Sequence, residues 1–157
     1  MQHEDADDLV KFMRKKGAVN AGQDIVNRDQ WCRFMEDWMR PAVDQVLTHV
    51  APLLTLHPSF RYVFKPFLTS DEATNLVWSP GSAWSAVGLA VLRCGSNPGT
   101  LAYSYFGRGS STDKPYLVRR VQYQVHSDGS VEHLQSGRGV NRRFHDLVSM
   151  LEEDVRI

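Results

Sequence analysis

The residues best suited to chemistry are basic and lie late in the chain. Two polar segments carry the same Gly-Arg-Gly tripeptide, at 107–109 and 137–139, and the second leads directly into the segment that we predict as the last helix. Glycines that allow close approach, arginines with forked donors and free N–H groups at a helix start together bind phosphate or carboxylate. The residues of this predicted anion-binding site are Arg108, Gly137, Arg138, Gly139, Arg142 and Arg143. A solvated rim is the plainer alternative, because neither spacing is a Walker or dinucleotide signature.

The charge of the same region bears on whether a nucleotide or nucleic acid is a partner. The whole chain is neutral, with 18 basic and 18 acidic residues, so no global field favours a polyanion. From residue 108 to residue 143, however, seven Lys or Arg residues stand against three acidic residues. Three tyrosines on predicted strands, Tyr103, Tyr105 and Tyr123, would offer stacking surfaces for bases, although packing under helices explains them equally well. A nucleotide or nucleic-acid backbone therefore stays an alternative partner.

Two histidines, His126 and His133, approach each other across the turn of a predicted hairpin. Beside the polar loop 107–115 either one would suit a small hydrolase or transferase, because histidine exchanges protons near neutral pH. Two histidines without a third ligand at a suitable spacing do not make a zinc site, so we expect no metal and no cofactor. The sequence also lacks a Gly-x-Ser-x-Gly elbow, so no nucleophile stands out.

Length and composition favour one ordinary globular domain. The 157 residues are 42% hydrophobic, which is enough to bury a core. The longest apolar run, 83–92, is too short to span a bilayer, and the acidic start of the chain lacks the features of a secretory signal. Cys32 and Cys94 are each embedded in apolar sequence, so we expect buried thiols in a reducing compartment. We expect a cytoplasmic protein with no membrane partner.

The clearest structural signal is the segment 116–134, which alternates apolar and polar residues as a strand does. An Asp-Gly dipeptide in its middle predicts a turn between two antiparallel strands. A two-residue turn would pair Val125 with Glu132, whereas a three-residue loop with a bulge at Gly129 pairs Val125 with Val131. We favour the bulged form because it sets one apolar side chain against another.

Periodicity and turn residues assign the remaining segments. The spacing of apolar residues predicts helices at 5–16, at 29–56 with Asp29 as the N-cap, and at 140–154. Pro41 is expected to kink or split the long helix, or to start its second half, and the Trp, Phe and Met stripe of that helix is expected to be core. β-Propensity and turn signals predict strands at 60–68, 76–78, 83–94 and 100–106, with a turn at 69–75. The segment 83–94 also fits a helix, and we favour the strand because a partner strand follows.

Helices followed by strands and a closing helix are typical of an α+β fold. We predict an antiparallel meander of five or six strands, with N-terminal helices and a C-terminal helix packed on one face, in a single domain over 1–157. Residues 1–28 are predicted to be either mobile or loosely packed. A core without a catalytic signature favours a protein-binding or adaptor module without catalytic activity, whose partner is another protein or a second copy. Immunity proteins and secretion chaperones use comparable layouts. The anion-binding module and the histidine-dependent enzyme are the alternatives.

Overall fold

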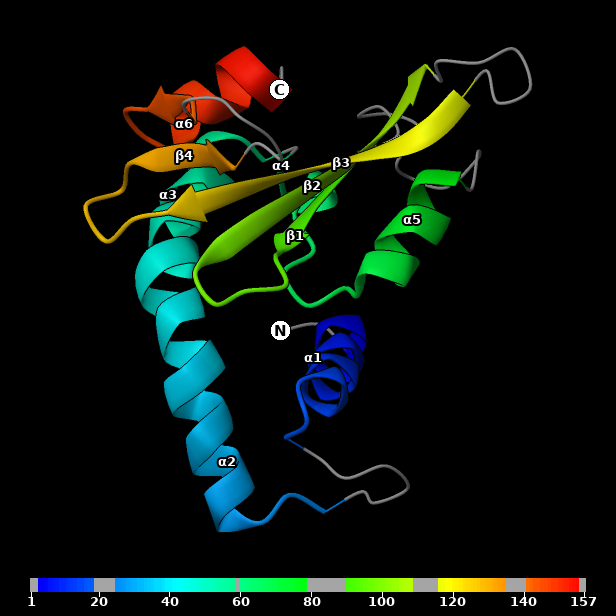
Figure 1. Cartoon of the computed structure of the whole chain (residues 1–157), viewed down its shortest axis with the longest axis vertical. Helices are drawn as coiled ribbons and strands as arrows, with labels where there is room; N and C mark the ends of the chain where they lie inside the picture. Colours follow the sequence, from blue (N-terminus) through cyan, green and yellow to red (C-terminus); the bar gives the residue numbers. More distant parts are fainter. Residues whose placement is uncertain are drawn as a thin grey trace.

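The computed structural model describes residues 3–18, 25–58, 60–78, 90–108, 116–134 and 141–155. These residues form helices first, then an antiparallel sheet, then a short closing helix (Figure 1). Strands that follow each other through short loops pair with each other and leave the helices to cover the sheet. The predicted α+β class is therefore confirmed.

The sheet is a five-stranded antiparallel meander. Its strands are neighbours in the order β1-β2-β3-β4-β5, which confirms the predicted topology. The strands are β1 (Ala90–Cys94), β2 (Thr100–Arg108), β3 (Tyr116–Val125), β4 (Val131–Leu134) and β5 (Arg143–Phe144). The strand predicted at 83–94 is confirmed over β1, and residues 83–89 lie outside the described part of the chain.

The turn between β3 and β4 has the bulged geometry that the sequence favours. Val125 pairs with Val131, so the two apolar side chains lie opposite each other. Gly129 has a φ of +89°, the left-handed conformation that glycine adopts without strain, and its N–H donates to the His126 carbonyl at 2.9 Å. This register points Tyr123 and Val125 into the core, where both are buried.

One long helix runs without interruption from residue 28 to residue 56 (Figure 1). Its parts are α2 (Arg28–Phe34), η1 (Met35–Met39), η2 (Ala42–Leu47) and α3 (Thr48–Leu56), of which η1 and η2 are π-helical. The helix neither splits nor restarts at Pro41, which lies between the two π-helical turns. Proline removes one backbone N–H and crowds the carbonyl four residues earlier, and the wider π-helical turns accommodate both effects.

Local signals set where the N-terminal helices begin and end. The long helix is capped by Asn27 and not by the predicted Asp29, because Asn27 Oδ1 accepts from the Gln30 N–H at 2.8 Å and Gln30 Oε1 accepts from the Asn27 N–H at 3.1 Å. The helix predicted at 5–16 is confirmed as α1 (His3–Lys15). Gly17, with a φ of +74°, ends α1 in the left-handed conformation.

The segment 60–68 is not the strand that its aromatic and β-branched residues predict. It contains the short helix α4 (Phe60–Val63), and an isolated bridge pairs Phe64 with Leu92 of β1. The rings of Phe60 and Phe64 stack with centroids 5.6 Å apart, a contact between residues four apart that helical winding produces. Burial of these rings under the long helix thus overrides β-propensity.

The segment 69–78 is a helix instead of the predicted turn and strand. α5 (Ser70–Trp78) starts with a capping box, in which the Thr69 hydroxyl accepts from the Glu72 N–H at 3.3 Å and the Glu72 carboxylate accepts from the Thr69 N–H at 2.9 Å. Ala73 and Val77, four residues apart, are both buried against the sheet. Capping and helical spacing therefore decide this segment.

The C-terminal helix begins later than predicted. In place of a helix over 140–154, the chain forms β5, then α6 (Leu147–Met150) and the π-helical turn η4 (Leu151–Val155). Asp146 is the N-cap, and its carboxylate accepts from the Ser149 N–H at 2.8 Å. Arg143 and Phe144, just before this cap, are extended and pair with β4, so the helix cannot begin before Asp146.

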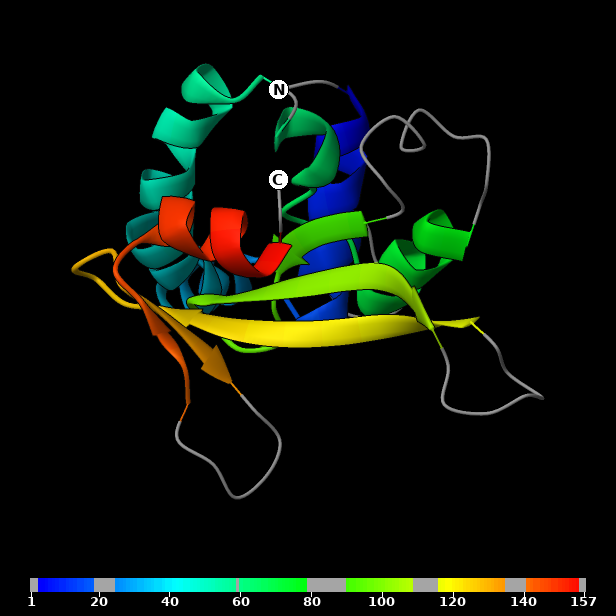
Figure 2. The ribbon, with the colours of Figure 1, turned by 90° about the horizontal axis from the view of Figure 1, so that it is seen from above.

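Helices pack on both faces of the sheet, and Figure 2 shows α6 and α5 toward opposite ends of β3. On one face the second half of the long helix and α6 cover the main core, as predicted for the N-terminal and C-terminal helices, and the unpredicted helix α4 covers it with them. The side chains of this core include Val46, Val50, Leu53, Phe60, Leu92, Leu101, Tyr123, Val125, Val131, Phe144 and Met150. On the other face α5 packs its Ala73 and Val77 against Val91 and Val118. The helix on this second face is therefore α5, which lies where the sequence predicts a turn and a strand.

Candidate functional site

The predicted anion-binding site does not assemble as a helix N-terminus. Arg108 is the last residue of β2, and the second Gly-Arg-Gly tripeptide, 137–139, lies outside the described residues. The last helix begins at Leu147, so this tripeptide does not lead directly into it. Asp146 places its own carboxylate at the helix start, in the position that a bound anion would take.

The two arginines nearest that helix already hold carboxylates of the protein. Arg142 donates to Glu153 and lies 3.7 Å from Asp154 Oδ1, both in η4. Arg143 lies 3.5 Å from Glu132 Oε2 on β4. These ion pairs account for the positions of both arginine side chains without a bound ligand. Anion binding at this site stays a prediction.

The two candidate histidines lie on opposite faces of the sheet. His126 Nε2 lies 3.1 Å from Glu132 Oε2, and the hydrogen bond from Asn141, together with His126, lowers the pKa of Glu132. The His133 ring packs at 5.2 Å from Tyr123, on the face that carries the main core. The bulged register separates the two imidazoles, so they do not form one site.

His133 belongs to a polar group at the edge of the core. The Tyr123 hydroxyl donates to Asp154 Oδ2 at 2.6 Å, and His133 Nδ1 lies 3.9 Å from the same oxygen. Burial and the bond to Asp154 raise the pKa of Tyr123 well above its usual range. Because Tyr123 keeps its proton and Asp154 also contacts Arg142, this group ties the last turn of the chain to the sheet.

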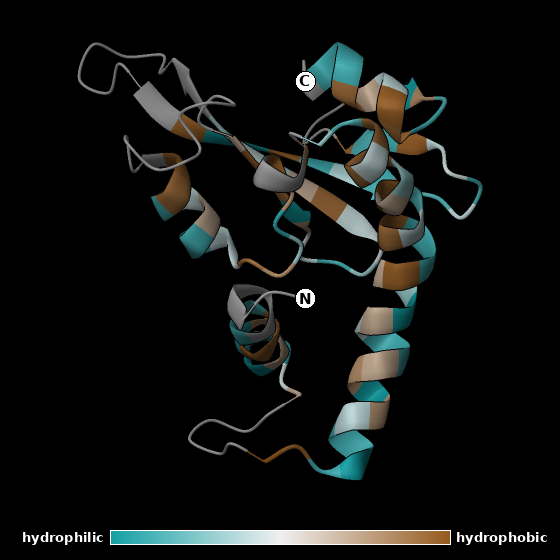
Figure 3. Cartoon of the chain, turned by 180° about the vertical axis from the view of Figure 1, so that it is seen from behind, coloured by the Kyte–Doolittle hydropathy of each residue, from teal (hydrophilic) through white to brown (hydrophobic). Residues whose placement is uncertain are grey.

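A different surface stands out on the first half of the long helix. We call residues 28–44 the helical arm, because this part extends beyond the sheet (Figure 1). Trp31, Met35 and Val43 on the arm are 46%, 36% and 40% exposed, and Met39 between them is half-buried. The predicted core stripe is thus exposed in part. Figure 3 shows hydrophobic and hydrophilic positions interspersed along the arm.

The inner face of the arm rests on α1 through aromatic contacts. The Phe12 ring meets Phe34 and Trp38 edge-on, with centroids 6.4 Å and 5.6 Å apart. Lys16 Nζ lies 3.7 Å from the centroid of the Trp38 ring and donates to the Ser96 carbonyl at 3.0 Å. Burial, with Lys15 and Arg93 nearby, lowers the pKa of Lys16. These contacts hold the arm by one face. Met39 also packs against this cluster, whereas Trp31, Met35 and Val43 remain exposed.

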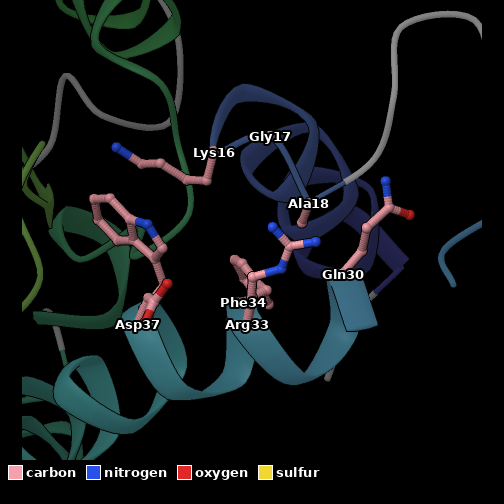
Figure 4. Close-up of a pocket in the computed structure, with 8 residues that line it drawn as sticks. Lys16, Gly17, Ala18, Gln30, Arg33, Phe34 and Asp37 are labelled. Atoms are coloured by element: carbon pink, nitrogen blue, oxygen red, sulfur yellow. The ribbon is translucent and has the colours of Figure 1, made fainter. Parts of the chain in front are cut away.

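A cavity of about 320 Å³ lies at this junction of α1 and the arm (Figure 4). Its walls come from the end of α1 and the inner face of the arm, namely Lys16, Gly17, Ala18, Gln30, Arg33, Phe34, Asp37 and Trp38. Charges of both signs line it, and Lys16 and Gln30 lie at opposite ends (Figure 4). The two candidate histidines, His126 and His133, lie elsewhere, beside and in β4.

The two thiols differ, contrary to the expectation that both are buried. Cys94 lies in the main core, and its burial raises the pKa of the thiol to about 12. Cys32 is exposed on the arm, next to Trp31. Trp31 and Met35, two of the apolar residues near Cys32, belong to the exposed stripe, which explains why the prediction for Cys32 is wrong.

The chain matches no family model, no curated protein and no solved structure. Within the described ranges, no three His, Cys, Asp or Glu side chains are placed to hold a metal ion. Nor does any described helix have the length and apolarity needed to cross a membrane. The surfaces described above are therefore the basis for a function.

Proposed function

We propose that the protein is a protein-binding module whose docking surface is the exposed apolar stripe of the helical arm. The supporting observation is the exposure of Trp31, Met35 and Val43 on one continuous helix. Contiguous apolar surface is unfavourable in water, and on folded proteins it usually marks an interaction site. Aromatic and methionine side chains also dominate the energetics of known interfaces.

The winding of the arm aligns its stripe. Trp31, Met35, Met39 and Val43 follow each other at intervals of four residues. Four residues exceed one turn of an α-helix and fall short of one π-helical turn. Because the arm alternates α-helical and π-helical turns, the two deviations offset each other. The stripe therefore runs nearly parallel to the helix axis, as a partner helix requires.

The partner that fits this stripe is a second copy of the chain, with the two arms antiparallel. In a pairing centred on Asp37, Trp31 of one copy meets Val43 of the second copy, and Met35 meets Met39 of the second copy. Charge complementarity supports this direction. In this register the segment 28–33, which carries two basic residues and one acidic residue, lies opposite the segment 41–46, whose single charged residue is Asp44. Antiparallel arms set these segments against each other.

Light scattering after size exclusion, and sedimentation over a wide range of concentration, test this proposal. We expect a dimer, and we expect Met35→Glu to weaken it by at least about tenfold, because the carboxylate loses water at the centre of the interface. Leu56→Glu is the matched control, since Leu56 is an exposed leucine at the other end of the same helix. A wild-type protein that stays monomeric throughout, or equal effects of the two variants, would refute the proposal.

The direction of the arms has its own test. Arg28 and Asp44 are both exposed on the flank of the stripe, at its two ends. In antiparallel arms each lies near the other residue of the second copy, so Arg28→Glu and Asp44→Arg should each weaken the dimer. The double variant should restore affinity. A double variant weaker than either single one would exclude the antiparallel arrangement.

We also propose a cytoplasmic location. Both cysteines are free, and one of them is exposed. An exposed thiol persists in a reducing compartment and oxidises outside it. Fusion to a redox-sensitive reporter in the native cell would measure the compartment directly, and an oxidised signal would contradict this location.

A further inference from the structure

Arg93 of β1 is a buried cation. Its side chain is 5% exposed and turns toward α5, on the face opposite the main core. One Nη1–H donates to the Cys94 carbonyl at 2.9 Å, whereas the buried Nε–H has no hydrogen-bond partner. No described carboxylate forms a salt bridge with it. A guanidinium removed from water without a counter-charge is strongly unfavourable, so a bound anion would stabilise Arg93.

Ser104 of β2 is a second buried donor on the same face. It is 0% exposed, and its Oγ has no hydrogen-bond partner. In the sheet Ser104 lies opposite Val91, and Arg93 lies opposite Ala102. Arg93 and Ser104 are therefore diagonal neighbours, about 7–8 Å apart at the backbone, and Ala102 and Val91 occupy the other two positions of this cell. Two unsatisfied donors thus flank the same point of the sheet.

Further positive charge surrounds this point. Arg120 of β3 lies directly opposite Ser104, and its Nη2–H donates to the Thr74 hydroxyl of α5 at 2.7 Å. Burial lowers the pKa of Arg93, and the charge of Arg120 lowers it further, while Asp71 has a weaker opposite effect. Two guanidinium groups that repel each other are stabilised together by one anion between them.

We propose that Arg93, Ser104 and Arg120 form a binding site for a single anionic group, a carboxylate or a phosphate, between the sheet and α5. Charge-assisted hydrogen bonds from arginine are strong, and here Arg93 offers them from a buried position and Arg120 from an exposed one. The Ser104 hydroxyl donates a hydrogen bond to the same group. This site is separate from the predicted one around Arg138 and Arg142, and it is independent of the dimer.

Side-chain NMR of the Arg93 Nε–H group is the direct test, with sodium phosphate and sodium acetate titrated separately into the full-length protein. We expect a saturable shift with one of the two anions, and the anion that causes it identifies the ligand class. Thermal unfolding should rise in midpoint with the same anion, because binding to the folded state alone stabilises it. Absence of a saturable shift with both anions would overturn the site.

Variants separate a specific site from a general salt effect. Arg93→Met keeps the length of the side chain and removes its charge, and it should weaken anion binding at least about tenfold. Arg119→Met is the matched control, because Arg119 neighbours Arg120 in β3 and points to the opposite face. Equal responses of the two variants would overturn the proposal. Should Arg93→Met fail to fold, Ser104→Ala keeps the test decisive: unchanged affinity in this variant also overturns the site.

Discussion

The two halves of the long helix have similar apolar spacing and opposite surroundings. In the second half, Val46, Val50 and Leu53 are 1%, 1% and 2% exposed and pack on the sheet. In the first half, Trp31 and Met35 repeat with the same spacing and remain exposed. Periodicity shows that a helix has an apolar face, but it does not show what covers that face.

Charge separates the two halves better than periodicity does. The arm, residues 28–44, contains seven charged residues, whereas residues 45–56 contain none. A stretch without charges favours packing against protein, and residues 45–56 place Val46, Val50 and Leu53 in the core while their outward face stays exposed. The arm needs one contact for its inner face, which α1 provides. A charge-free stretch therefore locates the core half of this helix.

The largest expected difference between the halves is the reactivity of their thiols. Cys32 on the arm is exposed, whereas Cys94 packs against the second half and has a pKa raised to about 12 by burial. A thiol-specific reagent near pH 8 should label Cys32 in the native protein and Cys94 after unfolding in urea, because the thiolate is the reactive form. Mass spectrometry of digested protein identifies the site. Labelling of both at equal rates would show that Cys94 is not in a stable core.

The next largest effect is expected from the buried half. Leu53→Ala should lower the free energy of unfolding by about 2–5 kcal/mol, since it removes buried methyl groups and leaves a cavity between the helix and the sheet. Leu54→Ala is the matched control, because the adjacent Leu54 is exposed. Urea unfolding followed by circular dichroism measures both variants. Similar losses would mean that the face assigned to the core is wrong.

Two glycines with positive φ allow a finer comparison, because one lies beside each half. Gly129→Ala should lower stability by about 1–2 kcal/mol from backbone strain alone. The new Cβ would also lie 3.1 Å from His49 Cε1 in α3. Gly17, beside the arm, has a similar φ, but a Cβ there would meet nothing within 4 Å.

Gly17→Ala should therefore cost less than Gly129→Ala, by the contribution of the contact with His49. Thermal unfolding of the two variants at the same pH measures the difference. The reverse order would show that the β3–β4 turn does not rest on the second half of the helix.

The sheet is the part of the fold that sequence predicts best. Strand alternation and the Asp-Gly turn are local signals, and the choice between Glu132 and Val131 as the partner of Val125 follows from matching apolar side chains. The secondary structure of segment 60–78 is harder to predict from sequence, because Phe60, Val63 and Phe64 are residue types that favour strands. The capping box of Thr69 and Glu72 is the signal that indicates α5.

The sites were predictable to a smaller extent. Arg142 is visible as a basic residue, but its partners Glu153 and Asp154 come from a helix whose start depends on the pairing of β5 with β4. Arg93 and Ser104 come together only through strand register, and their burial depends on α5. A site made by three strands and a helix cannot be inferred from spacing along one segment.

The smallest expected effect is on the arm, and it tests the comparison most sharply. Met35→Ala should change the free energy of unfolding by less than about 0.5 kcal/mol, because Met35 is exposed and alanine favours a helix. The measurement belongs at a protein concentration below that of dimer formation, where the stripe has no partner. At high concentration the same substitution should lower the melting temperature, since binding stabilises the folded state. A loss at low concentration as large as that of Leu53→Ala would mean that Met35 is already covered within one chain, and the arm would then have no free stripe to offer.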